Sequence, residues 1–251
     1  MINQPPDDYC LTAETQWTNL NEPASGATGG IWHSSSSGVA AVMKPANIAQ
    51  GRVEPFREWL ASRLAWSLDV NVPRVELYST VGGPAALSFR PGPVVHAYAA
   101  ALSSPLRTAA LSAFARYSNV LVLDVLIGAE DRSTNNLVYD EASSTWYSID
   151  YSYCLSIGAG RGRGSASQAY VQPYFPEFIQ AVRGNTALIA STLLLAEQIA
   201  ENDIEALCSK PPPEFCDGGE RLQTVEYLAS RLTQIRQLLN QWLASHSIPP
   251  V

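Results

Sequence analysis

Long hydrophobic runs and positive charge are scarce in this sequence of 251 residues. No stretch of about 18 or more uninterrupted apolar residues occurs, so we expect no transmembrane segment. The N-terminal residues 1–8 lack the basic and apolar regions of a signal peptide, and we therefore expect a cytoplasmic protein. The net charge of −7 argues against a nucleic-acid binder, because affinity for phosphates needs a basic face.

Cysteine and histidine are too few and too scattered to suggest a metal centre. The four cysteines show no C-x-x-C spacing, and the three histidines show no metal-ligand spacing. Reduced thiols agree with a cytoplasmic location. What the sequence does contain is apolar material, at 46% of residues against 16% charged, which is typical of a globular chain.

The first 90 residues predict a small sheet with one helix. Residues 1–15 are polar and are expected to form a loose arm, and a glycine-rich segment follows at 26–30. Apolar residues recur every four positions from Glu54 to Leu68, which predicts a helix packed on one face. The predicted strands are 31–33, 39–43, 75–78 and 85–89.

The remaining residues predict a mainly helical lobe. A long apolar segment from 106 to 127 is typical of a helix, and a second hairpin is expected after it. The segment 158–164 is rich in glycine and is expected to be a mobile loop. The strands of the second hairpin are 136–139 and 146–149, and the further helices are 176–183, 186–201, 203–209 and 220–245. The sequence thus predicts an α+β fold with a β-rich N-lobe at 1–90 and a helical C-lobe at 91–251.

Acidic and amide side chains flank the second predicted hairpin. Asp131 and Asn136 precede its first strand and Asp150 ends the second, so the hairpin should bring all three to one end of a small sheet. Phosphoryl transfer needs an aspartate that orients or deprotonates the acceptor, and oxygen ligands for magnesium. The alternative for Asp131 is a solvated turn, because Asp and Asn side chains readily cap their own turns.

A lysine follows five apolar residues of a predicted strand, where it is poorly placed unless its ammonium group has a partner. This residue is Lys44, and Glu58 lies on the next helix. In kinases a strand lysine holds nucleotide phosphates and is itself positioned by a helical glutamate. Glu54, four residues earlier on a similar face, is the competing partner, and exposure of both charges to water is the other alternative.

Glycines before the first predicted hairpin allow backbone amides to approach phosphates, although glycine clusters also mark ordinary turns. The order of the signals favours the first interpretation. A glycine loop, a strand lysine, a helical glutamate, an Asp-x4-Asn segment, a hairpin and an aspartate follow one another as phosphoryl transfer requires. The residues expected to bind the nucleotide are Gly26, Thr28, Gly29, Gly30, Lys44, Ser88 and Phe89.

Two stretches resemble known kinases. The segments 25–32 and 42–47 are similar to the nucleotide-binding lobe of type II phosphatidylinositol 4-kinases and the related HipA-like kinases. The run 122–132, with Asn136 and Asp150, is similar to their catalytic and metal-binding segments. The resemblance covers roughly residues 25 to 155.

The resemblance implies a two-lobed protein-kinase-like fold that uses ATP and Mg²⁺. Lys44 would contact the phosphates and Glu58 would hold Lys44. Asp131 would be the catalytic aspartate, and Asn136 and Asp150 would bind magnesium.

The chain also differs from these families at two places. Ser133 stands where many members have His or Gly, and Tyr151-Ser152 follows Asp150 where lipid kinases often have Phe-Gly or Asn-Gly. Both differences bear on the acceptor class and on the catalytic rate, and they leave the metal ligands intact.

Three functions follow from this resemblance. The first is a HipA-like protein Ser/Thr kinase, because an acidic chain without an acylation motif or polybasic segment fits a protein acceptor better than an anionic membrane. The second is a phosphoinositide-type lipid kinase, in which Arg161 and Arg163 would meet the headgroup. The third is a pseudokinase that serves as a binding module and would lack a phosphate or metal residue. No such residue is visibly missing.

Overall fold

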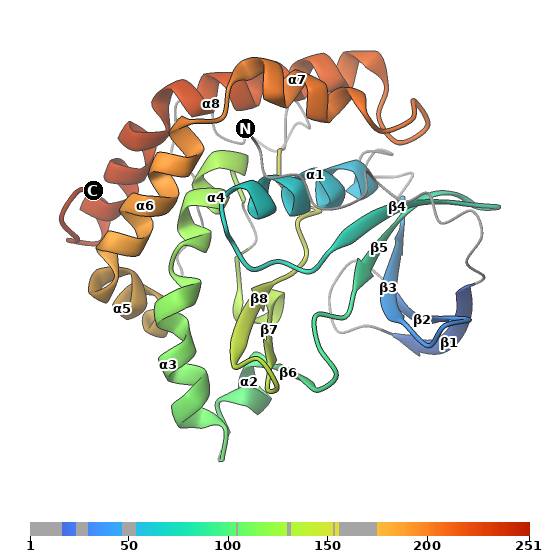
Figure 1. Ribbon diagram of the computed structural model, residues 1–251, viewed down its shortest axis with the longest axis horizontal. Helices are drawn as coiled ribbons and strands as arrows, with labels where there is room; N and C mark the ends of the chain where they lie inside the picture. Colours follow the sequence, from blue (N-terminus) through green and yellow to red (C-terminus); the bar gives the residue numbers. More distant parts are fainter. Residues whose placement is uncertain are drawn as a thin grey trace.

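The computed structural model describes residues 17–23, 30–46, 54–103, 105–129, 132–152, 154–155 and 175–251. These residues form a five-stranded sheet, a three-stranded sheet and a group of helices that is concentrated in the C-terminal half (Figure 1). The predicted α+β class is confirmed.

The larger sheet is antiparallel and has the strand order β1-β2-β3-β5-β4. Its strands are β1 (Trp17–Pro23), β2 (Ile31–Ser35), β3 (Ala40–Pro45), β4 (Val75–Thr80) and β5 (Gly83–Phe89). Four of them lie close to the predicted strands. The edge strand β1 was not expected, and its pairing with β2 is irregular between Asn19 and Pro23.

Helix α1 (Glu54–Ser67) agrees with the predicted helix and is enclosed on most sides. Eleven of its fourteen residues are buried, including charged ones. The helix packs against β4 and β5 on one side and against α4 (Val120–Ile127) on another. In Figure 1 the helices α7 (Glu201–Ser209) and α8 (Gly218–Ser245) pass above α1, so that it lies between the sheet and the C-terminal helices.

The second part of the fold is mainly helical, and most of its elements match the prediction. The single helix expected over 106–127 is instead two helices, because the chain turns at Ser118 and Asn119. The side-chain amide of Asn119 donates to the carbonyl of Asp69 at 2.8 Å and holds this turn. The remaining elements are β6 (Val95–Ala97), α2 (Tyr98–Ala101), α3 (Arg107–Tyr117), a 3₁₀ turn η1 (Thr134–Asn136), β7 (Leu137–Asp140), β8 (Thr145–Ser148), α5 (Pro176–Gly184) and α6 (Thr186–Glu197).

The small sheet β6-β7-β8 is fixed to the helices by aromatic packing. Trp146 of β8 stacks on Phe114 of α3 with ring centroids 4.7 Å apart, and its indole N–H donates to the carbonyl of Ala110 at 2.7 Å. Trp146 is 1% exposed, so this contact is fully desolvated. The hairpin β7-β8 is therefore held in a defined position relative to α3, which matters because candidate site residues flank it.

Helix α8, near the end of the chain, holds the last turn of α4 in place. The buried guanidinium of Arg231 donates to the carbonyls of Val125 and Leu126, which lie at the end of α4 where carbonyls lack helical partners. Gly128 ends α4 in the left-handed conformation with φ 60°.

Among the described helices, none is by itself long and apolar enough to cross a membrane. The pairs α3 with α4 and α5 with α6 reach that length and apolarity only together, and they are bent by 54° and 82°.

Candidate active site

One face of the larger sheet supplies the first part of the site. In β3, Val42 is opposite Trp32 of β2 on one side and Ser88 of β5 on the other, and Lys44 follows two residues later. Side chains two residues apart on a strand share a face, as do directly opposed residues. Trp32, Val42, Lys44 and Ser88 are therefore brought to one surface by the strand register alone.

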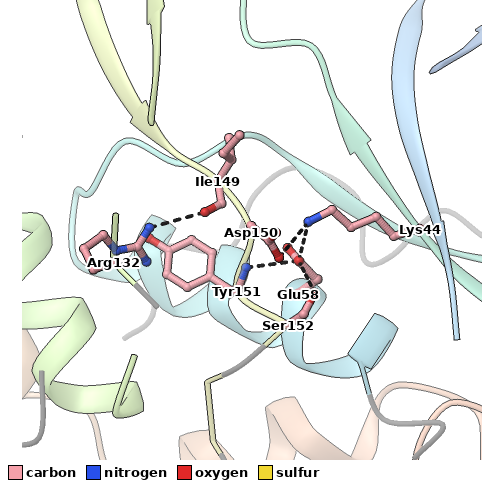
Figure 2. Close-up of polar contacts among 7 residues, drawn as sticks. All are labelled: Lys44, Glu58, Arg132, Ile149, Asp150, Tyr151 and Ser152. Carbon is pink, nitrogen blue, oxygen red and sulfur yellow. Dashed lines mark hydrogen bonds and ion pairs between the residues drawn. The ribbon is translucent and has the colours of Figure 1, made fainter. Parts of the chain in front are cut away.

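Lys44 forms an ion pair with the helix that packs on this sheet. Its Nζ donates to Glu58 Oε1 at 2.6 Å (Figure 2). The Glu58 side chain is 3% exposed and that of Lys44 is 14% exposed. Of the two carboxylates that the sequence left open, Glu54 and Glu58, the structure thus pairs Glu58 with Lys44.

Asp150 reaches the same lysine from the other part of the fold. It follows β8, and its Oδ1 lies 3.1 Å from Lys44 Nζ. Its backbone has φ 61°, the left-handed region that Asp tolerates better than most residues because of its short polar side chain. Sheet, helix and hairpin therefore meet at one ammonium group.

Glu58 also binds the residues that follow Asp150. Its Oε1 accepts the backbone N–H of Tyr151 at 3.0 Å and the hydroxyl of Ser152 at 2.9 Å (Figure 2). Ser152 is 3% exposed. One carboxylate oxygen is therefore the common acceptor for three donors, and it connects α1 to the chain after β8.

Arg132 holds the same segment from the opposite side. Its buried guanidinium forms two hydrogen bonds with Asp124 of α4, at 2.9 and 3.0 Å, and donates to the carbonyl of Ile149 at 3.3 Å. The guanidinium also lies 4.6 Å from the ring centroid of Tyr151. Figure 2 shows Arg132 and Lys44 approaching the segment 149–152 from its two sides.

The charges of the cluster stabilise one another. Burial alone would lower the pKa of Lys44, but the carboxylates of Glu58 and Asp150 outweigh it and hold that pKa above its usual value. Burial alone would raise the pKa of Asp150, but the Lys44 ammonium outweighs it and holds that pKa below its usual value. One ammonium therefore faces two carboxylates, and the cluster carries an excess of negative charge.

A pocket opens beside this cluster between the larger sheet and the β7-β8 hairpin. Lys44 and Asp150 line its polar end, and its volume is about 630 Å³ including the open mouth. Apolar walls come from both lobes. The other residues that line it are Gly30, Trp32, Val42, Pro73, Ser88, Phe89, Arg90, Pro91, Val95, Val138 and Ile149.

The structure brings several of the predicted site residues close to one another. Gly30, Ser88 and Phe89 line the pocket with Lys44 and Asp150. Asn136 is 5% exposed, and its carbonyl accepts the N–H of Ile149 at 3.0 Å, which places Asn136 and Asp150 at one end of the hairpin as predicted. The roles of these residues stay predictions.

Some predicted residues lie outside the described part of the chain. They are Gly26, Thr28, Gly29, Asp131, Arg161 and Arg163, together with the rest of the 158–164 segment.

Two residues at this end of the hairpin carry oxygen donors of the kind that magnesium prefers. Among the described residues, no group of three or more His, Cys, Asp or Glu side chains is suited to hold a metal. Mg²⁺ is commonly held by one or two protein oxygens together with substrate phosphates, so the Asp150 carboxylate and the Asn136 amide match its donor preference. The excess negative charge around Lys44 also favours a cation over a bare phosphate.

Sequence reasoning missed several residues of this site. The apolar walls formed by Trp32, Val138 and Ile149 gave no signal, because alternating apolar residues in strands are expected whether or not they line a pocket. Arg132 and Ser152 were noted only as neighbours of motif residues. A sequence signal for Arg132 did exist, since Asp124 precedes it by eight residues within an apolar helix, where a carboxylate needs a partner.

Comparison with known proteins supports the fold. No protein-family model and no curated protein sequence matches the chain. Among solved structures, the chain is similar to the crystal structure of a Helicobacter pylori proinflammatory kinase, CtkA, with 12% sequence identity and a TM-score of 0.58. The match covers 93% of this chain and 96% of that chain. A likeness at this identity concerns architecture, and it shows that the chain has the two-lobed α+β fold of a kinase.

Proposed function

We propose that this chain is an ATP-dependent phosphotransferase that uses Mg²⁺, and more specifically a HipA-like kinase that phosphorylates Ser or Thr side chains of a cytoplasmic protein. The observation that carries the proposal is the ion-pair cluster of Lys44, Glu58 and Asp150 at the polar end of the pocket between the two lobes. In a kinase-like fold this is the arrangement needed to hold nucleotide phosphates.

The nucleotide would occupy the pocket with its base between the apolar walls. Val42 lies on the sheet side of the pocket and Val138 on the hairpin side, and the base would lie between them. The phosphates would then point towards Lys44, whose raised pKa keeps it protonated throughout the physiological range. Gly30 also lines the pocket, and the residues before it would contribute backbone amides to the phosphates.

Asp150 and Asn136 would hold the magnesium ion, which would neutralise charge on the phosphates. In the reaction, the acceptor hydroxyl oxygen forms a bond to the γ-phosphorus, and the bond from that phosphorus to the β,γ-bridging oxygen breaks. ADP leaves with the electron pair of the broken bond. The hydroxyl proton passes to a carboxylate base, for which we propose Asp131.

A protein acceptor agrees with the charge of the molecule. A net charge of −7 opposes approach to an anionic lipid surface unless a local basic patch compensates. The lipid-kinase and pseudokinase alternatives become outcomes of the test below.

Transfer can be tested directly. The protein is incubated with magnesium and ATP labelled at the γ-phosphate, with basic and neutral protein substrates in one arm and phosphatidylinositol vesicles in another. We expect label in protein, which acid hydrolysis of the polypeptide yields as phospho-Ser or phospho-Thr and a phosphatase releases as inorganic phosphate. Label in lipid alone would assign the second function, and nucleotide binding without transfer to either would assign the third.

The lysine content of the chain offers an independent test of nucleotide binding. Lys44 and Lys210 are its two lysines, and Lys210 does not line the pocket. An acyl-phosphate derivative of ATP transfers its acyl group to a lysine beside bound phosphates. We expect mass spectrometry to find the label on Lys44 and not on Lys210, and excess ATP to prevent it. Equal labelling of both lysines would contradict nucleotide binding at this pocket.

A further inference from the structure

We propose that Ser152 is a positioning residue of this site and that its hydroxyl holds Asp150 in place by binding Glu58. This role rests on the proposed function. Ser152 does not touch the reacting atoms, and its effect would pass through the position of the Asp150 carboxylate.

The backbone of Asp150 needs such support. Its φ of 61° lies in the left-handed region, which residues other than glycine occupy at a cost. Conformations of this kind persist only where the surrounding structure fixes them, and they are common where a side chain must be aimed at a ligand. The contacts on both sides of Asp150 therefore decide whether its carboxylate stays beside Lys44.

On the N-terminal side of Asp150, both backbone polar groups of Ile149 are hydrogen-bonded. The N–H of Ile149 donates to the carbonyl of Asn136 at 3.0 Å, and the carbonyl of Ile149 accepts from Arg132 at 3.3 Å. On the C-terminal side, the N–H of Tyr151 and the hydroxyl of Ser152 both bind Glu58. The hydroxyl is the side-chain contribution to this C-terminal anchor.

Glu58, which accepts the hydrogen bond from Ser152, lies on a helix that is fixed by packing. Glu58 lies on α1, of which eleven of fourteen residues are buried between the sheet and the helices around α4. Ser152 thus transmits the position of a rigid helix to the residue two places before it in the chain. Because Ser152 is itself buried, water does not replace its hydroxyl when the side chain is removed.

Magnesium-dependent nucleotide binding separates this role from a merely structural one. The variants are Ser152→Ala, which removes the hydroxyl, and Ser152→Thr, which keeps it. Ser118→Ala is the matched control, because Ser118 is a buried serine after α3 whose hydroxyl donates to the carbonyl of Ala115 at 2.8 Å, and neither residue lines the pocket. Calorimetry with a non-hydrolysable ATP analogue is carried out with magnesium and with EDTA for each protein.

In the wild type we expect magnesium to tighten binding of the analogue. In Ser152→Ala we expect this gain in affinity to be about tenfold smaller, because a hydrogen bond to a charged group contributes at least the free energy that corresponds to a tenfold change. The affinity measured in EDTA should be unchanged. In transfer assays kcat should fall by about tenfold with a smaller change in KM, because the nucleotide still binds but its phosphates are less well aligned. Ser152→Thr should restore both quantities, and Ser118→Ala should leave both at the wild-type level.

An unchanged magnesium gain in Ser152→Ala would overturn the proposal, and so would equal losses in Ser152→Ala and Ser118→Ala. These results leave the proposed function standing, because the wild type still binds and transfers. A wild type that does not bind the analogue at all would overturn both the proposed function and the role of Ser152.

Discussion

Replacing Asp150 by asparagine removes a charge from the centre of the site while it changes little else. Asn has nearly the same shape as Asp and tolerates the left-handed backbone that Asp150 adopts with φ 61°. The anchors on either side of the residue, at Ile149 and Tyr151, use backbone groups and stay available. Any large effect of Asp150→Asn therefore reports on the carboxylate charge.

The expected loss of stability is small. For unit charges 3.1 Å apart, an effective dielectric constant of about 20 gives about 5 kcal/mol of attraction between Lys44 and Asp150. Most of this is offset because the buried carboxylate no longer has to be desolvated, and because Lys44 keeps Glu58 at 2.6 Å. We expect the free energy of unfolding to fall by about 1–2 kcal/mol.

The expected loss of activity is much larger. An anionic magnesium ligand contributes several kcal/mol to the stabilisation of developing charge, which corresponds to about a 10³-fold fall in kcat/KM. An amide keeps one oxygen ligand but not its charge, so Asp150→Asn should fold normally and transfer phosphate very poorly.

Acid provides a second measure of the same group. The pKa of Asp150 is lowered in the folded protein, so its ion pair stabilises the fold above the usual aspartate pKa of about 3.9 and loses this effect as pH falls further. Wild-type stability should therefore fall as pH decreases below about 4, by an amount that Asp150→Asn lacks.

The measurements are urea unfolding at several pH values and transfer of γ-phosphate. Asp140→Asn is the matched control, because Asp140 lies at the other end of the same hairpin, is also buried, and caps its turn by accepting from the N–H and hydroxyl of Ser143. It should lose stability and retain activity. Wild-type turnover in Asp150→Asn would refute the kinase mechanism, and equal loss of turnover in both variants would show that the effect is not specific to the site.

Three further changes test other parts of the structure. Glu58→Gln should lower kcat by about 10²-fold, because Lys44 is then drawn towards Asp150 alone, and steady-state kinetics would contradict this if only KM changed. Arg132→Lys should lower the free energy of unfolding, measured by chemical denaturation, by about 2–4 kcal/mol, because an ammonium cannot reproduce the paired hydrogen bonds to the buried Asp124. A loss below about 0.5 kcal/mol, the size of an ordinary surface effect, would contradict this. Burial raises the pKa of the Cys208 thiol to about 12, so it should react with a thiol reagent at pH 8 only after unfolding, and rapid labelling of the native protein would refute its burial.

Much of the fold could be predicted because its elements have local signals. Helix α1 follows from an apolar residue every fourth position, and β3 from an apolar run before Lys44. Strand β1 lacked a signal, since its sequence WTNLNEP has no alternation and carries asparagine and proline, and it is stabilised by pairing with β2. The division between α3 and α4 was also invisible, because Ser118 and Asn119 are tolerated inside helices and the contact of Asn119 with Asp69 is tertiary.

The site could be predicted only in part, for a similar reason. The order of Lys44, Glu58 and Asp150 along the chain indicated a phosphate-binding cluster, and the structure brings these three together. The choice between Glu54 and Glu58 could not be made from spacing, because residues four apart share a helix face and the register of α1 on the sheet depends on packing. The contact of Ser152 with Glu58 spans 94 residues and was equally out of reach.

The contacts of the cluster differ in what they connect, and this determines how the site responds to motion between the lobes. The ion pair of Lys44 with Glu58 joins the sheet to its own helix, so it would survive if the sheet and α1 moved together. The contacts of Lys44 with Asp150, and of Glu58 with Tyr151 and Ser152, cross from that unit to the segment after β8. Separation of the two units would break all three crossing contacts at once and leave a buried carboxylate with fewer donors, which is costly. The same charges that would bind magnesium and phosphate therefore also hold the pocket closed around them, and the site is complete only in the closed arrangement.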